Sequence, residues 1–373
     1  MQTNSKTHDN RQDKFSIAYA KEYTKEHKLP FIVHWNLTES CNLRCTHCCV
    51  PKKPVFVSLE DARKTIKFLK EKGFFLVTLS GGECTTHPDF PRIYEALIDN
   101  GFYVSIFTNG THFTPEIKEV LRHYPPRKVE VSCYGVDAPD FKNTTGSDTG
   151  YDEFLDTLQF LKDSRIRTVV KAPITVKNAS HIQNFIRLAD RFDAEYKFGT
   201  FVFPGLDGNK DVLSDRLQVE PTVDIEFSDE GHMMGFVDRA NSMGTDKNPI
   251  DIKCAAMSNS FTLNPDNSFS FCGIMSYPRF RFGFQHGDIP IQKAFEAVIA
   301  YRETVREMYE ESPCGNCSMA NVCPGCPAHL LLENGDYRSC DEYFRDGTLC
   351  KLEYCAKKGL IENHESFSFS LHA

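Results

Sequence analysis

The stretch FIVHWNLTESCNLRCTHCC, residues 31–49, joins an apolar run typical of a buried strand to a loop with four thiols in nine residues. Cys41, Cys45 and Cys48 have the spacing CxxxCxxC. Three thiolates on one loop can bind zinc together with a fourth ligand from the same loop. They can also hold a four-iron, four-sulfur cluster that leaves one iron open to a substrate or cofactor. The spacing alone leaves both interpretations open.

Composition limits the compartment and the partners. The chain has 373 residues, a formal net charge of -8 and 15 cysteines. Its Lys and Arg residues are scattered, which argues against a nucleic-acid partner, and no apolar run is long enough to span a membrane. The polar N-terminus is no signal peptide, so we predict a cytoplasmic protein without membrane partners. Because disulfides are disfavoured in that compartment, this many cysteines indicates metal or cluster ligation.

Residues 31–203 alternate short apolar runs with longer amphipathic stretches. The predicted strands are Phe31–Leu37, Phe74–Leu79, Tyr103–Phe107, Lys128–Ser132, Thr168–Val176 and Lys197–Phe203. The predicted helices are Ser58–Lys72, Asp89–Asn100, Pro115–His123, Tyr151–Asp163 and Ser180–Phe192. Six strand-then-helix units predict an α/β fold with a parallel sheet, and we favour a partial (β/α)6 TIM-like barrel. A doubly wound open sheet is the alternative, although its glycine fingerprint is missing after the first strand.

The segment LSGGEC ends the second predicted strand, with Gly81, Gly82 and Glu83 at its tip. The C-terminal ends of barrel strands carry ligand-binding groups. Two glycines allow a backbone to approach a ligand closely, and a carboxylate beside them can accept hydrogen bonds from an amine. Taken alone, the segment is better explained as a glycine turn followed by a surface acid.

The cysteine loop after the first strand and the GGE segment after the second together resemble the radical S-adenosylmethionine (SAM) superfamily. The resemblance implies that Cys41, Cys45 and Cys48 hold a 4Fe-4S cluster whose open iron binds SAM. It also implies that Gly81, Gly82 and Glu83 receive the SAM amino group. A 5'-deoxyadenosyl radical made from SAM then abstracts hydrogen from a substrate.

Two later segments extend the resemblance to the SAM site. FTNGT ends the third strand and places Thr108 and Asn109 there, and VEVSCYGVD places Ser132 at the end of the fourth strand. For these three residues the alternative to SAM contact is an ordinary polar strand end.

The sequence departs from its relatives at one position near SAM. Relatives often carry an arginine-glycine pair where this chain has Thr145 and Gly146. We expect the cation for the SAM carboxylate to come from elsewhere, and Lys142 and Lys171 are the candidates.

The last third of the chain holds nine cysteines, and its run CGNCSMANVCPGC has the paired spacing of a zinc ribbon. Attached to a radical SAM core, it resembles the SPASM domain, which carries auxiliary iron-sulfur clusters. Asn267 stands where that pattern usually has glycine, and the final gap of the run is one residue short. The resemblance implies two ligand groups. The first is Cys254, Cys272 and Cys326, and the second is Cys314, Cys317 and Cys323 with Cys350 or Cys340.

The first auxiliary cluster has two predicted states. Relatives with a fully ligated cluster carry another cysteine where this chain has Ser258 and Ser260, so one iron could stay open to a substrate thiolate. Alternatively, whichever of Cys340 and Cys350 is left over closes it. The remaining thiols are expected to be buried and not ligands, namely Cys49, Cys84, Cys133 and Cys355.

These features predict an N-terminal arm over residues 1–30, the barrel over 31–235, a connector over 236–250 and the SPASM-like domain over 251–373. We predict an oxidoreductase that oxidises or crosslinks a ribosomally made peptide, a RiPP maturase that could form thioethers. Its expected cofactors are SAM, the 4Fe-4S cluster at the SAM site and one or two auxiliary clusters. The expected partners are a peptide or protein substrate and an electron donor such as flavodoxin or ferredoxin. No leader-binding module is expected before the barrel, so a separate leader-binding protein could supply that function.

Three other functions remain open. A sulfatase-type maturase is less favoured, because such enzymes have an acid where this chain has Gly273. A small-molecule dehydrogenase is the second. The third, from another class, is a zinc-stabilised binding protein.

Overall fold

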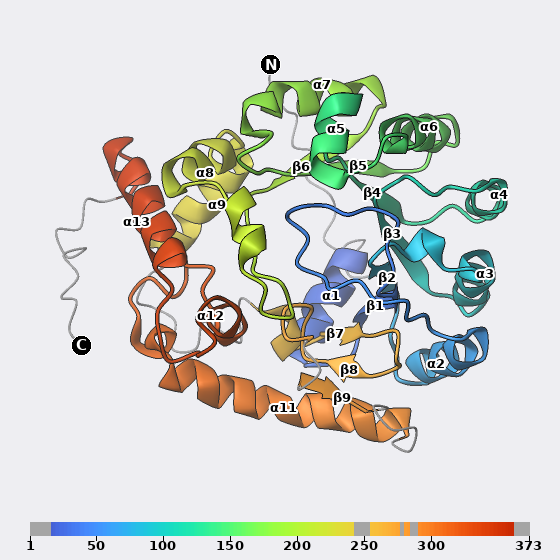
Figure 1. Ribbon diagram of the computed structural model, residues 1–373. Helices are drawn as coiled ribbons and strands as arrows, with labels where there is room; N and C mark the ends of the chain where they lie inside the picture. The colour runs from blue at the N-terminus through green and yellow to red at the C-terminus, as the bar shows by residue number, and fades with distance from the viewer. Residues whose placement is uncertain (1–15, 242–253, 277–279, 284–289, 362–373) are drawn as a thin grey trace.

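A computed structural model describes residues 16–241, 254–276, 280–283 and 290–361 of this chain. A single nine-stranded sheet forms its centre, in the order β6-β5-β4-β3-β2-β1-β7-β8-β9 (Figure 1). The strands are β1 (Ile32–Thr38), β2 (Leu76–Gly81), β3 (Tyr103–Thr108), β4 (Lys128–Ser132), β5 (Thr168–Pro173), β6 (Glu195–Gly199), β7 (Ser260–Leu263), β8 (Phe269–Ser270) and β9 (Arg281–Phe282). Strands β1 to β6 pair in parallel in chain order, which confirms the predicted partial barrel.

Helices cover the outer face of this sheet. Those of the barrel are α2 (Leu59–Glu71), α3 (Phe90–Asp99), α4 (Pro115–His123), α5 (Ala138–Thr145), α6 (Gly150–Asp163) and α7 (Ile182–Arg191), preceded by α1 (Ile17–Glu26). Helix α2 begins where the sequence predicted, because the Ser58 hydroxyl accepts a hydrogen bond from the backbone N–H of Asp61 at 3.0 Å. The helix α5 was not predicted.

The strands separate an apolar face from a polar one. Along β4, Val129 and Val131 are buried in the hydrophobic core under the helices. Glu130 between them points to the opposite face, where it pairs with Lys128 and Lys197. The concave side of the partial barrel is therefore lined by polar groups and can hold a polar ligand.

Two predicted strands extend three or four residues past the observed ends. The fifth strand was predicted to reach Val176 but ends at Pro173, and the sixth was predicted to reach Phe203 but ends at Gly199. The rings of Phe201 and Phe203 leave the sheet and contact the C-terminal region, where both are tilted against the ring of Phe344. Contact with another element therefore outweighs the local strand preference of these residues.

The C-terminal region continues the barrel sheet. Strand β7 pairs in parallel with β1, with Ile32 opposite Ser260, and β8 and β9 follow antiparallel. The helices of this region are α11 (Ile291–Glu311), α12 (Pro327–Asn334) and α13 (Glu342–Lys357), and α8 (Val219–Glu226) and α9 (Glu230–Asn241) connect it to the barrel. A second, smaller core lies where α13 packs on α8 and α9. Most of the predicted connector, residues 242–250, lies outside the described residues.

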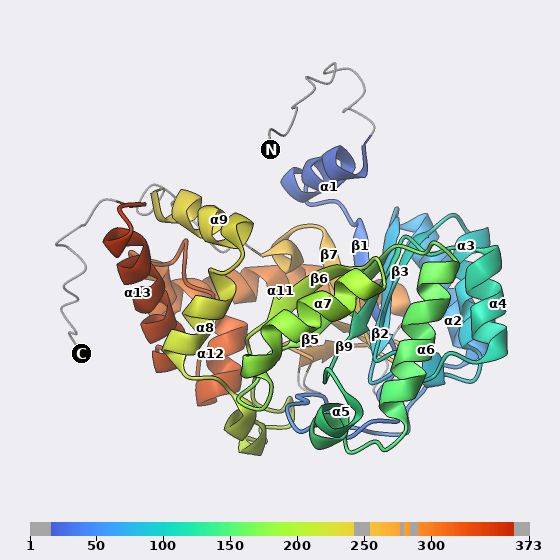
Figure 2. The same ribbon diagram turned by 90° about the horizontal axis from the view of Figure 1, so that it is seen from above.

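The two ends of the barrel differ (Figure 2). Helix α1 lies at the N-terminal end of the strands, and the loop after β1 lies at the opposite end beside α5. Two backbone hydrogen bonds hold the loop there. The N–H of Arg44 donates to the Thr145 carbonyl at 2.9 Å, and the N–H of Thr46 donates to the Thr144 carbonyl at 3.0 Å. Within the described residues, no helix is long and apolar enough to cross a membrane.

Candidate functional site

The structure gathers the three thiols of the CxxxCxxC loop at the C-terminal end of β1. Burial raises the pKa of Cys45 to about 12, and the neighbouring thiols of Cys48 and Cys41 raise it further. Burial also raises the pKa of Cys41, whose sulfur accepts the backbone N–H of Leu43 at 3.5 Å. The thiols of Cys41 and Cys45 are therefore difficult to ionise without a nearby cation. Neighbouring thiols of this kind are suited to binding one shared cationic partner, such as a metal centre.

The two glycines after β2 allow the loop to approach. A Cβ atom added to Gly82 would lie 2.2 Å from the Ser40 carbonyl oxygen, and one added to Gly81 would lie 2.3 Å from that of Thr38. The backbone N–H groups of Gly82 and Glu83 donate to the same two carbonyls at 2.9 and 2.8 Å. The glycines were predicted to admit a ligand, and here they admit the backbone that carries the cysteines.

The carboxylate of Glu83 accepts its hydrogen bonds from other groups of the protein. It is 1% exposed and accepts hydrogen bonds from the N–H and hydroxyl of Thr85, the hydroxyl of Thr108 and the N–H of Asn109, at 2.5 to 3.1 Å. Burial still raises its pKa, because these bonds only partly offset the loss of water. Glu83 and Thr108 therefore fasten the tip of β2 to the tip of β3.

Asn109 connects β3 to the cysteine loop. Its side-chain amide donates to the Asn42 side-chain oxygen at 2.9 Å and contacts the Cys41 sulfur at 3.9 Å. Its own oxygen accepts from the N–H and hydroxyl of Thr111, each at 2.8 Å. The FTNGT segment thus orients the first cysteine of the loop.

Tyr134 is a neighbour of the cysteine loop that sequence reasoning missed. Its half-buried side chain hydrogen-bonds the side chains of both Ser132 and Cys45. Burial raises the pKa of this phenol, and the nearby thiols, Cys45 first, raise it further. The signal available in the sequence was position, because Tyr134 follows Ser132 by two residues at a strand end.

His47, inside the cysteine loop, carries a buried nitrogen without a protein partner. Among the described residues, its Nδ1 accepts or donates no hydrogen bond, and its ring lies 5.6 Å from that of Tyr134. Burial lowers the pKa of His47 to about 4. A buried polar atom left unpaired is costly, so this position fits a polar ligand such as a nucleoside.

The two lysines proposed for the SAM carboxylate lie in different places. Lys142 is exposed and pairs with Asp148 at 2.5 Å. Lys171 is opposite Ser132 at the end of β5, and its Nζ lies 5.6 Å from the centre of the Phe107 ring. Only Lys171 is placed by its strand pairing beside a predicted SAM-site residue.

A second group of thiols lies in the C-terminal region. Burial raises the pKa of Cys272 to about 12, and the nearby thiols of Cys326 and Cys254 contribute further. Cys254 precedes β7, Cys272 follows β8, and Cys326 is the N-cap of α12. Three segments distant in sequence therefore converge, as the predicted first auxiliary ligand group requires.

A third group lies around Gly325. A Cβ atom added to Gly325 would lie 3.3 Å from the Cys323 sulfur and 3.7 Å from the Cys314 sulfur. Burial raises the pKa of Cys340, and the next influences on it are Cys323 and Cys317. Of the two candidates for the fourth ligand of this group, Cys340 therefore lies near two of its other cysteines.

Cys350 has different neighbours. Burial raises its pKa, and the carboxylates of Glu220, Glu353 and Asp224 raise it as well. All fifteen cysteines lie in the described ranges, and none of them forms a disulfide. The described residues contain no group of three potential ligands close enough for a single metal ion.

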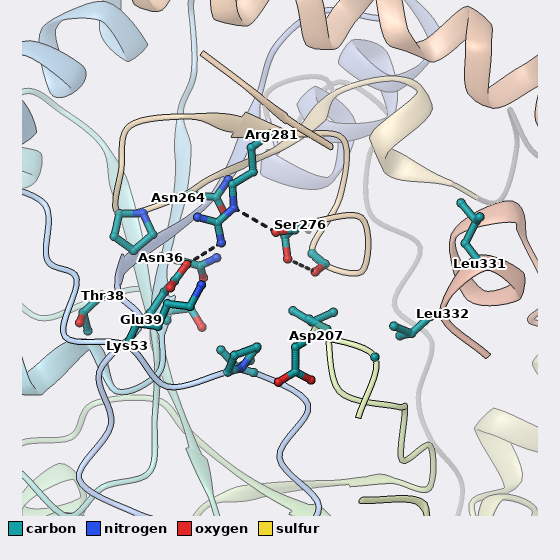
Figure 3. Close-up of a pocket in the computed structure, with 18 of the residues that line it drawn as sticks. Asn36, Thr38, Glu39, Lys53, Asp207, Asn264, Ser276, Arg281, Leu331 and Leu332 are labelled. Carbon is teal, nitrogen blue, oxygen red and sulfur yellow. Dashed lines mark hydrogen bonds and ion pairs between the residues drawn. The ribbon is translucent and has the colours of Figure 1, made fainter. Parts of the chain in front are cut away.

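A cavity of about 880 Å³ lies at the tips of β1 and β2 (Figure 3). One wall comes from these tips and from Val50 to Lys53, directly after the cysteine loop, and the other includes Gly273, next to Cys272, and Leu331 and Leu332 of α12. Arg281 reaches between the walls: it donates to the Glu39 carboxylate at 2.5 Å and to the Ser276 carbonyl at 3.0 Å. This volume suits a small molecule or a short peptide segment.

The fold and the thiol loop define the class of this protein, a partial-barrel enzyme built around an iron-sulfur centre at the C-terminal ends of its strands. More narrowly, residues 35–189 match the radical SAM superfamily, so this part of the chain is a radical SAM domain. The predicted superfamily, its enzyme class, and its SAM and iron-sulfur cofactors are confirmed.

Two relatives and one solved structure cover most of the chain. An AdoMet-dependent heme synthase of Methanosarcina barkeri is 25% identical over 84% of this chain and 96% of its own length. The mycofactocin maturase MftC of Mycobacterium tuberculosis is 26% identical over 79% of this chain and 78% of its own. The Streptococcus suis SuiB structure bound to its precursor peptide SuiA shares the fold, with a TM-score of 0.66 and 14% identity over 92% of this chain and 84% of SuiB.

Proposed function

We propose that this protein is a radical SAM maturase that oxidises or crosslinks a side chain of a ribosomally made peptide. The observation that carries the proposal is the cavity whose lining includes Glu39 and Val50, on either side of the CxxxCxxC loop, and residues that follow Cys272 and Cys326. A substrate there would touch the radical source on one side and an auxiliary centre on the other. The likeness to MftC, a maturase, and to SuiB, solved with a precursor peptide, supports a peptide substrate.

In this proposal Cys41, Cys45 and Cys48 hold the 4Fe-4S cluster that binds SAM. Together they supply reductive cleavage of SAM and the radical that takes a hydrogen atom. The unpaired Nδ1 of His47 supports a polar ligand beside this loop. Because the Glu83 carboxylate is committed to β3, we assign the SAM amino group to the backbone carbonyls of the GGE turn. Ser132 and Lys171 would face the rest of SAM.

For the auxiliary clusters we assign Cys254, Cys272 and Cys326 to the first. To the second we assign Cys314, Cys317, Cys323 and Cys340. We prefer Cys340 over Cys350 because, beyond burial, the thiols of Cys323 and Cys317 raise the pKa of Cys340, whereas carboxylates lie near Cys350. The first cluster then has three protein thiolates, so an open iron could bind a substrate thiolate. We further propose that the thiols stay reduced in the cytoplasm, that a flavodoxin or ferredoxin supplies the electron, and that a separate protein binds the leader.

The test begins with the radical source. Anaerobically reconstituted protein mixed with SAM and dithionite should yield 5'-deoxyadenosine. Replacing Cys41, Cys45 and Cys48 together by Ala should abolish that product. The matched control is Cys355→Ala, which removes a buried thiol outside the three groups. Persistent 5'-deoxyadenosine in the triple variant would refute the assignment.

One observation favours a second candidate function, oxidation of a porphyrin-like small molecule. The heme synthase relative aligns over nearly its whole length, and Lys53 and Lys210 in the cavity lining could pair with carboxylates. Mass spectrometry separates the two functions. Loss of hydrogen from a precursor peptide encoded beside this gene supports the first, and formation of heme from a porphyrin precursor supports the second.

A further inference from the structure

Arg302 of α11 is a buried charge that forms no ion pair with the residues that the structure describes. This residue is only 8% exposed to solvent. Its Nε donates to the Ala256 carbonyl at 2.9 Å, and the guanidinium lies 4.7 Å from the centre of the Phe261 ring. Its Nη2 has no hydrogen-bond partner among the described residues. Burial lowers the pKa of Arg302 to about 10, and Cys254 opposes that shift.

A buried guanidinium without an anionic partner costs free energy of folding. A guanidinium carries five N–H donors, and a buried charge is normally paired with a carboxylate or another anion. Two partly buried arginines follow that rule: Arg216 pairs with Glu333, and Arg281 pairs with Glu39. Among the described residues Arg302 forms no ion pair, and the thiol of Cys254 is the group that favours its charge. The missing anion therefore belongs beside Cys254.

We propose that Arg302 is the counter-charge of the first auxiliary iron-sulfur cluster and donates its unpaired N–H to a sulfur of that cluster. This inference rests on the proposed assignment of Cys254, Cys272 and Cys326 to that cluster. Iron-sulfur clusters bound by thiolates are anionic, and hydrogen bonds to their sulfurs set their reduction potentials. Arg302 is thus a positioning residue: it stabilises the reduced, more negative state of the cluster against its oxidised state.

The experiment compares Arg302→Met, which keeps side-chain length and removes the charge, with Arg302→Lys, which keeps the charge. Lys293→Met is the control, because it removes one positive charge from an exposed position of the same helix. All are made in the full chain with Cys41, Cys45 and Cys48 replaced by Ala, so that only auxiliary clusters remain. A potentiometric titration followed by electron paramagnetic resonance measures each cluster. The relevant signal is the one lost when Cys272→Ala is added.

Arg302→Met should lower the equilibrium constant for one-electron reduction of that cluster at least about tenfold, a midpoint shift of about 59 mV to the negative side. Arg302→Lys should stay within about threefold of the parent, and Lys293→Met should match it. An Arg302→Met midpoint equal to that of the control would overturn this inference alone. Absence of any signal that depends on Cys272 would overturn the ligand assignment as well.

A stability measurement separates this role from ordinary packing. In the cluster-free chain Arg302→Met removes an unpaired buried charge, so the midpoint of thermal unfolding should rise or stay unchanged. In the loaded chain the same substitution should speed iron loss to a chelator. If Arg302 served only to pack on Phe261 and to bond Ala256, Met would lower the unfolding midpoint of both forms. Arg302→Lys keeps the comparison informative if the Met variant fails to fold.

Discussion

The backbone N–H of Asn109 donates to the buried carboxylate of Glu83 at 2.5 Å, and this bond ties the tip of β3 to the tip of β2 directly beneath the cysteine loop. The same Asn109 contacts the Cys41 sulfur through its side chain. Glu83 is therefore connected to the first cysteine of the SAM site through one residue. In this chain the acid of the GGE segment acts as a structural fastener.

Glu83→Ala should accordingly unfold the SAM site rather than merely weaken SAM binding. Removing the carboxylate leaves buried donors on Thr85, Thr108 and Asn109 unsatisfied, each at a cost of about 1–3 kcal/mol. We expect a loss of at least about 3 kcal/mol in the free energy of unfolding of the cluster-free chain, measured with denaturant. Glu60→Ala, at an exposed α2 position, is the control and should change it by less than about 0.5 kcal/mol. Equal effects of the two variants would contradict the fastener role.

Gly82→Ala should abolish the SAM-site cluster through sterics alone. The added methyl group would lie 2.2 Å from the Ser40 carbonyl oxygen, a distance that requires the backbone before Cys41 to move. We expect iron at the SAM site to be lost and the free energy of unfolding to fall by about 1–3 kcal/mol. Gly199→Ala is the control, since its added Cβ meets no atom within 4 Å and it should load iron normally. Iron content and sulfide content per chain provide the measurement.

Cys340→Ala should remove the second auxiliary cluster, whereas Cys350→Ala should leave it in place. The thiol of Cys340 has Cys323 and Cys317 as neighbours, and that of Cys350 has carboxylates. Iron per chain should therefore fall by about one cluster, four irons, in the first variant only. A drop in the Cys350 variant with full iron in the Cys340 variant would reverse the assignment.

Local signals predicted the barrel well. Helix α4 and strand β4 have the predicted bounds, because Pro115 at the helix start and alternating apolar residues in the strand act within a few residues. Contacts between distant segments could not be predicted. The pairing of β7 with β1 joins residues more than 200 positions apart through only four residues of β7. A strand this short carries little periodicity of its own.

The site divides in the same way. Motif spacing identified the thiols that we propose for the SAM site, whereas the partners that orient them depend on the folded chain. Tyr134, whose side chain reaches Cys45, was invisible because no spacing rule connects a tyrosine to a cysteine loop eighty-odd positions earlier. Arg302 was missed for the same reason: only burial distinguishes it from the other arginines of the chain.

Stability in acid should depend on Glu226 of α8, which joins α8 to α13. Burial raises the pKa of Glu226, but hydrogen bonds from His232 and Thr200 and the Lys351 ammonium at 2.5 Å outweigh burial and lower the pKa to about 2. A carboxyl whose pKa is lower in the folded than in the unfolded chain stabilises the fold above its unfolded value of about 4.3. That stabilisation disappears as the pH falls toward the folded value. Between about pH 6 and about pH 3 the loss should be about 2 kcal/mol.

The measurement is the free energy of unfolding of the cluster-free chain, because acid destroys iron-sulfur clusters. Wild-type protein should lose about 2 kcal/mol more than Glu226→Gln over this range, since the amide does not titrate. Glu353→Gln is the control, because the Glu353 side chain is exposed on α13 and its carboxylate lies a long 3.6 Å from the Lys357 ammonium. It should follow the wild-type pH dependence closely, because an exposed pair contributes little. Parallel pH curves for wild type and Glu226→Gln would show that the Glu226–Lys351 contact does not join the two helices in solution.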